Sequence, residues 1–126
     1  MDKEAVIKYA LERYGAEPDH PWKKAPDYTV LRVKPGGKWF GLIMNIPKGR
    51  LGVQPGDEVC WVINLKCDPV FSSSLSPRDG VFPAYHMNKE KWVSVVIDEA
   101  DEELLKMLVD ISYRLVTRRK PLHLGR

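Results

Sequence analysis

The sequence has few cysteines, and the two present are poorly placed for a disulfide or a metal site. Cys60 and Cys67 lie in or beside one predicted strand of this 126-residue chain. An extended strand would separate them by about 23 Å, whereas a disulfide needs Cα atoms within roughly 7 Å. There is no CxxC pair, and His20, His86 and His123 are scattered. We expect free, buried or half-buried thiols, no metal and no cofactor.

The sequence also lacks long apolar runs, and we expect no secretory signal. The longest apolar runs, such as residues 93–97, are far shorter than the roughly 20 residues of a membrane-spanning helix. The N-terminus has the pattern of an amphipathic helix, not of a basic segment followed by an apolar one. We therefore expect a cytoplasmic protein without membrane association.

What is present is the composition of one ordinary folded domain covering residues 1–126. Hydrophobic residues make up 44% and charged residues 29% of the chain, which is typical of globular proteins. Four Trp, five Tyr and three Phe supply large side chains for a core.

Three helices are predicted. Residues 3–14 carry an apolar stripe, with Asp2 as the N-terminal cap and Gly15 as the end. Asp68, followed by a proline, opens a short helix. The third helix covers residues 101–118, and its stripe comprises Leu104, Leu105, Leu108, Ile111, Leu115 and Val116.

Strands are predicted at residues 28–34, 38–45, 58–65, 82–87 and 91–97, the last two forming a hairpin around residues 88–90. The proline-rich segment 17–26 reads as an irregular connection. The order α-β-β-β-α-β-β-α predicts a two-layer α+β fold, with an antiparallel sheet and helices packed on one face.

Four segments resemble the MmcQ/YjbR family: residues 37–43, 63–69, 85–92 and 110–116. The resemblance covers nearly the whole domain. It implies a CyaY-like α+β fold with a curved antiparallel sheet, in a family of small bacterial proteins for which DNA binding has been suggested. It brings no catalytic motif to carry over.

Basic residues are concentrated in two parts of the chain. Residues 20–50 contain seven Lys or Arg against the single acid Asp27, and residues 113–126 contain five and no acid. Gathered on one face, they would form a phosphate-contacting surface, to which Trp22 or Trp39 could add base stacking. A solvated basic surface without a partner is the alternative. The predicted nucleic-acid contacts are Lys23, Lys24, Lys34, Lys38, Lys48, Arg50, Arg118, Arg119 and Lys120.

A second group of polar residues comes from two of the family-like segments. If these segments meet, Cys67 could act as a nucleophile, His86 as its base and Asp68 as the group that orients the ring. The structural alternative, which we favour, makes Asp68 a helix cap and His86 a partner of nearby backbone. The full group is Lys66, Cys67, Asp68, His86 and Asn88.

A third possibility is a protein-binding module that uses the open face of the sheet. Cys60, Trp61, Val62 or Tyr28 would present apolar surface there. Our order of preference is a non-enzymatic DNA-binding protein, then a protein-interaction module, then a Cys/His-dependent enzyme.

Overall fold

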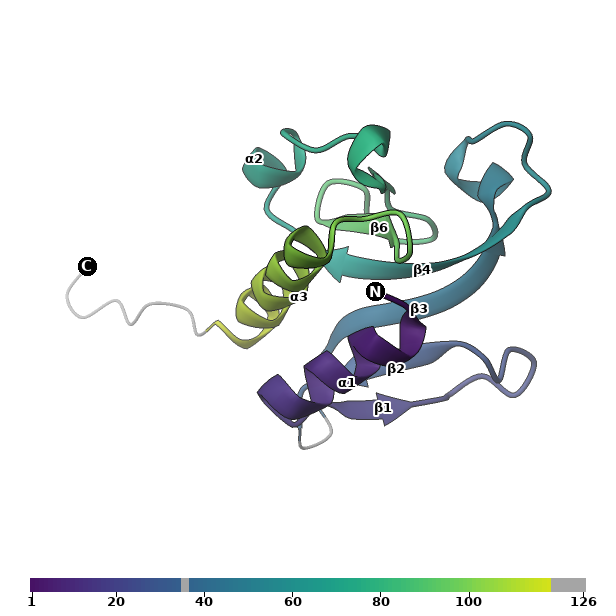
Figure 1. Cartoon of the computed structure of the whole chain (residues 1–126). Helices are drawn as coiled ribbons and strands as arrows, with labels where there is room; N and C mark the ends of the chain where they lie inside the picture. The colour runs from purple at the N-terminus through teal and green to yellow at the C-terminus, as the bar shows by residue number, and fades with distance from the viewer. Residues whose placement is uncertain (35–36, 119–126) are drawn as a thin grey trace.

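The computed structural model describes residues 1–34 and 37–118, and within them six antiparallel strands form one sheet with two long helices on one side (Figure 1). The strand order is β1-β2-β3-β4-β6-β5. The strands are β1 (Glu17–Asp19), β2 (Thr29–Arg32), β3 (Trp39–Pro47), β4 (Val59–Lys66), β5 (Val81–Pro83) and β6 (Trp92–Val96). The helices are α1 (Lys3–Tyr14), α2 (Pro69–Ser72) and α3 (Glu102–Thr117), with 3-10 turns η1 (Lys48–Leu51) and η2 (Pro77–Asp79). The predicted α+β class is confirmed.

The helices begin where the capping residues predict. The Asp2 carboxylate accepts a hydrogen bond from the Ala5 N–H at 2.8 Å, and the Asp68 carboxylate accepts one from the Val70 N–H at 2.8 Å. Gly15 ends α1 in the left-handed conformation, with φ of 61°, which glycine adopts without a steric penalty. Asp101 caps α3 in the same way as Asp2 caps α1.

Two strand predictions need correction. Residues Glu17–Asp19 form the edge strand β1, not an irregular connection. An edge strand tolerates Pro18 because one row of its backbone groups has no ladder partner, and an Asp19–Arg32 ion pair at 2.8 Å joins it to β2. In the predicted hairpin, the first arm is only Val81–Pro83, so residues 84–91 form a longer connection outside the sheet.

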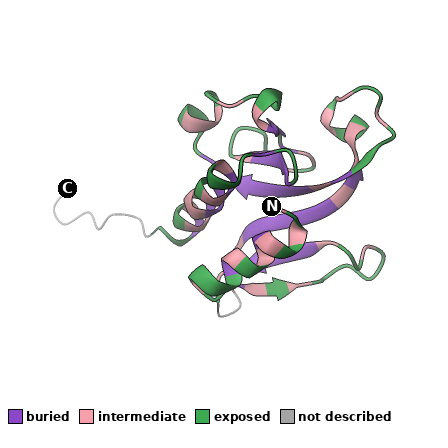
Figure 2. Ribbon diagram, viewed as in Figure 1, coloured by how far each residue is buried: buried purple, intermediate pink, exposed green. Residues whose placement is uncertain are grey.

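The sheet has two unlike faces. On the first, here called the helix face, α1 and α3 cover residues such as Phe40, Ile63 and Leu65. On the second, the loop face, Val62 and Met44 are covered by connections between strands, not by helices. In Figure 2 the central strands are coloured as buried.

Trp61 lies on the helix face, contrary to the expectation that it would present apolar surface on the open one. It packs against the helix-face core, and the Lys3 ammonium lies 4.2 Å from its ring centroid. Cys60 and Val62 do lie on the loop face, but they are buried. No helix within the described residues is long and apolar enough to cross a membrane.

Candidate functional site

A hollow of about 410 Å³ opens on the loop face. Its lining contains Trp22, Lys24, Ala25, Tyr28, Trp39, Leu42, Met44, His86 and Met87. Among the described residues that line it, none is acidic. The hollow is therefore apolar and aromatic in its walls and cationic in its charge.

Three aromatic rings and the strand β3 form one side of the hollow. Leu42 and Met44 are buried residues of β3. The Trp22 ring meets Tyr28 edge-to-face at 6.2 Å and Trp39 edge-to-face at 5.6 Å. Trp22 remains 36% exposed, so a flat ligand could reach its ring.

The opposite side comes from the connection between β5 and β6, which buried polar groups hold in place. The Asn64 side-chain amide donates to the Tyr85 carbonyl at 2.8 Å. The Tyr85 N–H donates to the Ser94 hydroxyl at 2.8 Å, and that hydroxyl donates to the Asn64 side-chain oxygen. Asn64 and Ser94 are fully buried, so this network fixes the backbone on both sides of the Tyr85 Cα.

His86 follows directly and has a strained backbone. Its φ of 62° makes it the one non-glycine residue with positive φ in the part of the chain that the structure describes. Such a conformation costs on the order of 1–3 kcal/mol and persists only where neighbours enforce it. The Tyr85 ring lies 3.9 Å from the imidazole, and Arg50 donates a hydrogen bond to the Tyr85 hydroxyl at 3.4 Å.

The predicted nucleic-acid contacts of the β1–β2 connection, the β2–β3 hairpin and η1 come from both ends of the sheet. Because neighbouring strands are antiparallel, the β1–β2 connection with Lys23 and Lys24 shares one end with η1, which contains Lys48 and Arg50. The β2–β3 hairpin is at the other end of β3 from η1, about 27 Å along the strand. The β1–β2 connection nevertheless reaches back toward the hairpin, because the Trp22 ring lies 5.6 Å from the ring of Trp39, the first residue of β3. This hairpin contains two further predicted contacts, Lys34 and Lys38.

The C-terminal end of α3 is on the hairpin side of the sheet. Ser112 of α3 donates to the Phe40 carbonyl at the start of β3 and accepts from the Lys66 N–H at the end of β4. Arg118, which follows α3, therefore lies toward the hairpin end. Arg119 and Lys120 fall outside the described residues.

The cations of the β1–β2 connection and of η1 differ in availability. The Lys48 ammonium pairs with Glu99 and with Glu58, the latter at 3.5 Å, and the hydrogen bond to Glu99 raises its pKa. Lys23, Lys24 and Arg50 are exposed and have no carboxylate partner within the described ranges. These three remain open to an anionic ligand.

The second predicted group, Lys66 to Asn88, is not assembled into one site. Cys67 is buried in the helix-face core, whereas His86 lines the hollow on the loop face. Burial, and then the nearby Asp68 carboxylate, raise the pKa of the Cys67 thiol, which disfavours the nucleophilic thiolate. The structure thus separates the nucleophile and base of the hypothetical enzyme.

The other members of that group have structural contacts. Asp68 caps α2, the Lys66 N–H donates to Ser112 at 2.9 Å, and the Asn88 side chain accepts from the Glu90 N–H at 2.8 Å in a turn. In the described part of the chain, no cluster of His, Cys, Asp and Glu could hold a metal ion.

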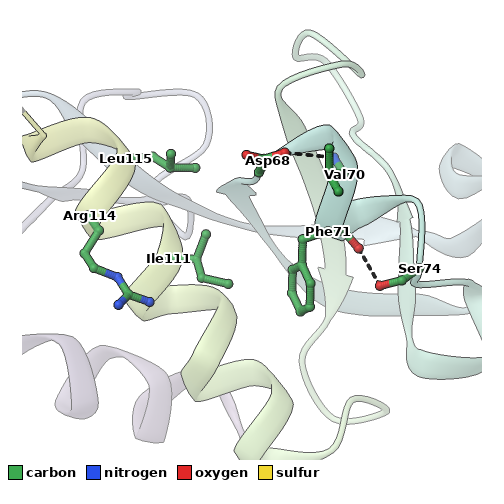
Figure 3. A pocket seen from close by; sticks show the side chains of 7 residues that line it. All are labelled: Asp68, Val70, Phe71, Ser74, Ile111, Arg114 and Leu115. Atoms are coloured by element: carbon green, nitrogen blue, oxygen red, sulfur yellow. Dashed lines mark hydrogen bonds between the residues drawn. The ribbon is translucent and has the colours of Figure 1, made fainter. Parts of the chain in front are cut away.

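A second concavity, of about 590 Å³, lies between α2 and α3. Figure 3 shows Phe71 of α2 beside Ile111 and Leu115 of α3, with Arg114 at its margin. Val70 is 82% exposed there. The Asp68 carboxylate in this groove already caps α2, so the aromatic hollow has the richer set of unengaged polar groups.

Sequence alone did not identify the whole hollow. Trp22 and Trp39 were predicted as stacking residues and Tyr28 as apolar surface on the open sheet face, but the contributions of Met44 and Met87 were missed. The sequence did contain one signal for the polar network beside the hollow. Asn64 and Ser94 are polar residues inside apolar strands, and such residues need internal partners when buried.

Known proteins match this chain over most of its length. The family model described as YjbR matches residues 11–115. The uncharacterized protein YyaQ of Bacillus subtilis is 41% identical over 103 residues, which cover 82% of this chain and 86% of that protein. The uncharacterized protein YbdF of Escherichia coli O157:H7 is 34% identical over 99 residues, covering 75% of this chain and 69% of that protein.

Solved structures agree with this sequence relationship. A crystal structure of a protein from Pseudomonas syringae has a TM-score of 0.85 and 39% sequence identity, covering 92% of this chain and 99% of that one. A protein from Deinococcus radiodurans, 24% identical with a TM-score of 0.71, covers 94% of this chain and 80% of its own and shares the fold. On the family match and these relatives, the chain belongs to the YjbR family.

Proposed function

We propose that this chain is a non-enzymatic, cytoplasmic binding protein that contacts DNA at the aromatic hollow of the loop face. The observation that carries the proposal is the Trp22-Lys23-Lys24 segment at the rim of the aromatic hollow, whose described lining contains no acid. Cations supply phosphate contacts, and exposed aromatic rings supply base contacts. Binding is favoured over catalysis because Cys67 is buried on the face opposite His86.

Three cations are assigned to the phosphates in this proposal: Lys23, Lys24 and Arg50. Their side chains are exposed and unpaired with carboxylates of the described residues. Asp27 is the single acid in residues 20–28 and does not line the hollow. Lys48 is left out because Glu58 and Glu99 already neutralise it.

The proposal differs from a general basic surface because it places the phosphate contacts beside an aromatic hollow. Trp39 lines that hollow and is the first residue of β3, so the hairpin with Lys34 and Lys38 begins at the edge of the hollow. We assign Lys34, Lys38 and Arg118 a secondary role, as contacts for longer DNA.

The test is a titration of the purified protein with labelled DNA of about 30 nucleotides or base pairs, at low and near-physiological salt. Lys23→Glu/Lys24→Glu is compared with Lys8→Glu/Arg114→Glu, which changes the net charge equally at exposed residues of α1 and α3 on the opposite face. We expect affinity to fall with salt, and the first double variant to lose roughly tenfold or more while the second loses less. Equal losses would indicate only non-specific attraction, and no binding at low salt would reject the proposal.

The second candidate is a protein-interaction module using the loop face. The supporting observation is the pair of flexible thioethers, Met44 and Met87, beside aromatic rings in the hollow, since such surfaces adapt to apolar side chains. If DNA does not bind, a pull-down with wild type and Trp22→Leu tests this alternative. A partner retained only by wild type would support it.

A further inference from the structure

We infer that the hollow on the loop face is a pocket for one unpaired base, so that the chain prefers single-stranded DNA to duplex. This inference rests on the proposed function and adds the form of DNA that the site accepts. It also assigns the Trp22 ring as the stacking surface.

The walls suit a flat, apolar ring. Trp22, Tyr28 and Trp39 present aromatic surface, while Met44 and Met87 add polarizable thioethers. Every base has a π face that stacks on such rings irrespective of its sequence. The volume of about 410 Å³ lies within the roughly 300–1,000 Å³ of small-ligand pockets.

The polar groups suit a nucleotide better than a purely apolar ligand. Among the described lining residues, His86 and Lys24 are the titratable ones apart from the Tyr28 hydroxyl. An imidazole can hydrogen-bond the edge of a base, and the Lys24 ammonium, with the adjacent Lys23, can pair with the flanking phosphates. No described acid in the lining would repel them.

The pocket is also held in shape before a ligand arrives. Asn64 and Ser94 fix the Tyr85 backbone through hydrogen bonds of 2.8 Å each. Tyr85 in turn is held by Arg50 and lies against His86. This network keeps His86 at a φ of 62° beside the hollow. A preorganised wall lowers the ordering cost of binding.

In duplex DNA, an unpaired base becomes available only at a free-energy cost. Its bases are stacked and their edges are paired, and extruding one costs a few kcal/mol. A base in a single strand is available without that cost. The base pocket therefore predicts a preference between two DNA forms that contain the same phosphate chemistry.

The experiment measures binding of a labelled thymidine oligomer of about twelve nucleotides and of the matching duplex, by anisotropy, with tryptophan fluorescence as a second readout. The variants are Trp22→Leu and Trp22→Phe, and Trp61→Leu on the helix face is the matched control. Circular dichroism melting checks that each variant folds. Free thymidine monophosphate serves as a competitor.

We expect tighter binding of the single strand, with quenched tryptophan fluorescence. Trp22→Leu should lose about fivefold or more in affinity, Trp22→Phe should keep most of it, and Trp61→Leu should keep all of it. Trp22→Leu should leave the salt dependence unchanged, because it removes no phosphate contact.

Three outcomes would overturn the inference. Equal affinity for both DNA forms, unchanged in Trp22→Leu, would leave the proposed function standing without a base pocket. Competition by free monophosphate at the same nucleotide concentration would make the hollow a site for free nucleotides. Absence of binding to either DNA would reject the proposed function as well.

Discussion

The helix face and the loop face of this sheet bury similar residues in different ways. α1 and α3 cover Phe40 and Ile63 on the helix face. On the loop face, connections between strands cover Val62 and Met44 and leave a hollow of about 410 Å³. The long helices place continuous apolar stripes against the sheet, and the concavity on that side, about 590 Å³, lies between α2 and α3 and not against the central strands. In the proposed function, the helix face contributes mainly to stability and the loop face to binding.

Each face also has one fully buried serine that ties its covering to the sheet. On the helix face, Ser112 of α3 bonds to the Phe40 carbonyl at 2.6 Å and to the Lys66 N–H at 2.9 Å. On the loop face, Ser94 bonds to the Tyr85 N–H and to Asn64. The first serine positions a helix, and the second positions the wall of the hollow.

The largest expected effect comes from adjacent residues of β3 that face opposite ways. Ile43 is fully buried on the helix face, and Leu42 is 7% exposed beside the hollow. Ile43→Ala should lower the free energy of unfolding by about 3–5 kcal/mol, and Leu42→Ala by about 2 kcal/mol, because water can enter the space left beside the hollow. Urea unfolding measures both. Equal losses would mean that the faces are packed equally well.

The second prediction compares the two serines. Ser94→Ala and Ser112→Ala should each cost about 1–3 kcal/mol of unfolding free energy, because each leaves a buried N–H and a buried oxygen with a lost partner. Only Ser94→Ala should also weaken binding of single-stranded DNA, since it releases the Tyr85 backbone. The measurements are urea unfolding and anisotropy. Loss of DNA binding in both variants would remove the distinction between the faces.

The smallest effect concerns the hydrogen bonds that join α1 to α3 above the helix face. Tyr9 donates to the Asp110 carboxylate at 2.9 Å, and burial followed by this bond raises the pKa of Tyr9 to about 12. Between the unfolded pKa of 10.0 and 12, the unfolded chain loses this proton first, so the stability provided by Tyr9 is present below pH 10 and lost as pH rises. The unfolding free energy of wild type should fall more steeply there than that of Tyr9→Phe.

Tyr14 provides a second test of this pH dependence. It also donates to Asp110, and burial followed by that bond raises its pKa. The double variant Tyr9→Phe/Tyr14→Phe should therefore have a flatter alkaline profile than Tyr9→Phe, measured as the urea midpoint against pH. Identical slopes in wild type and both variants would show that these hydroxyls do not contribute.

The sequence by itself determined the features that depend on neighbours along the chain. Helix α1 follows from an apolar stripe between Asp2 and Gly15, and the alternating faces of β4 follow from a period of two. Both patterns repeat within a few residues, where covalent geometry sets the spacing. The two-layer α+β fold and the family resemblance rest on such local segments and their order.

Tertiary structure alone decided which distant segments meet. Strand β1 exists because Glu17–Asp19 pairs with β2, although Pro18 weakens its local signal. The sheet places Cys67 and His86 on opposite faces. It also brings Trp22, Trp39 and His86 around one hollow. No local period contains this information, because strand pairing and face parity set the distances between segments far apart in the chain.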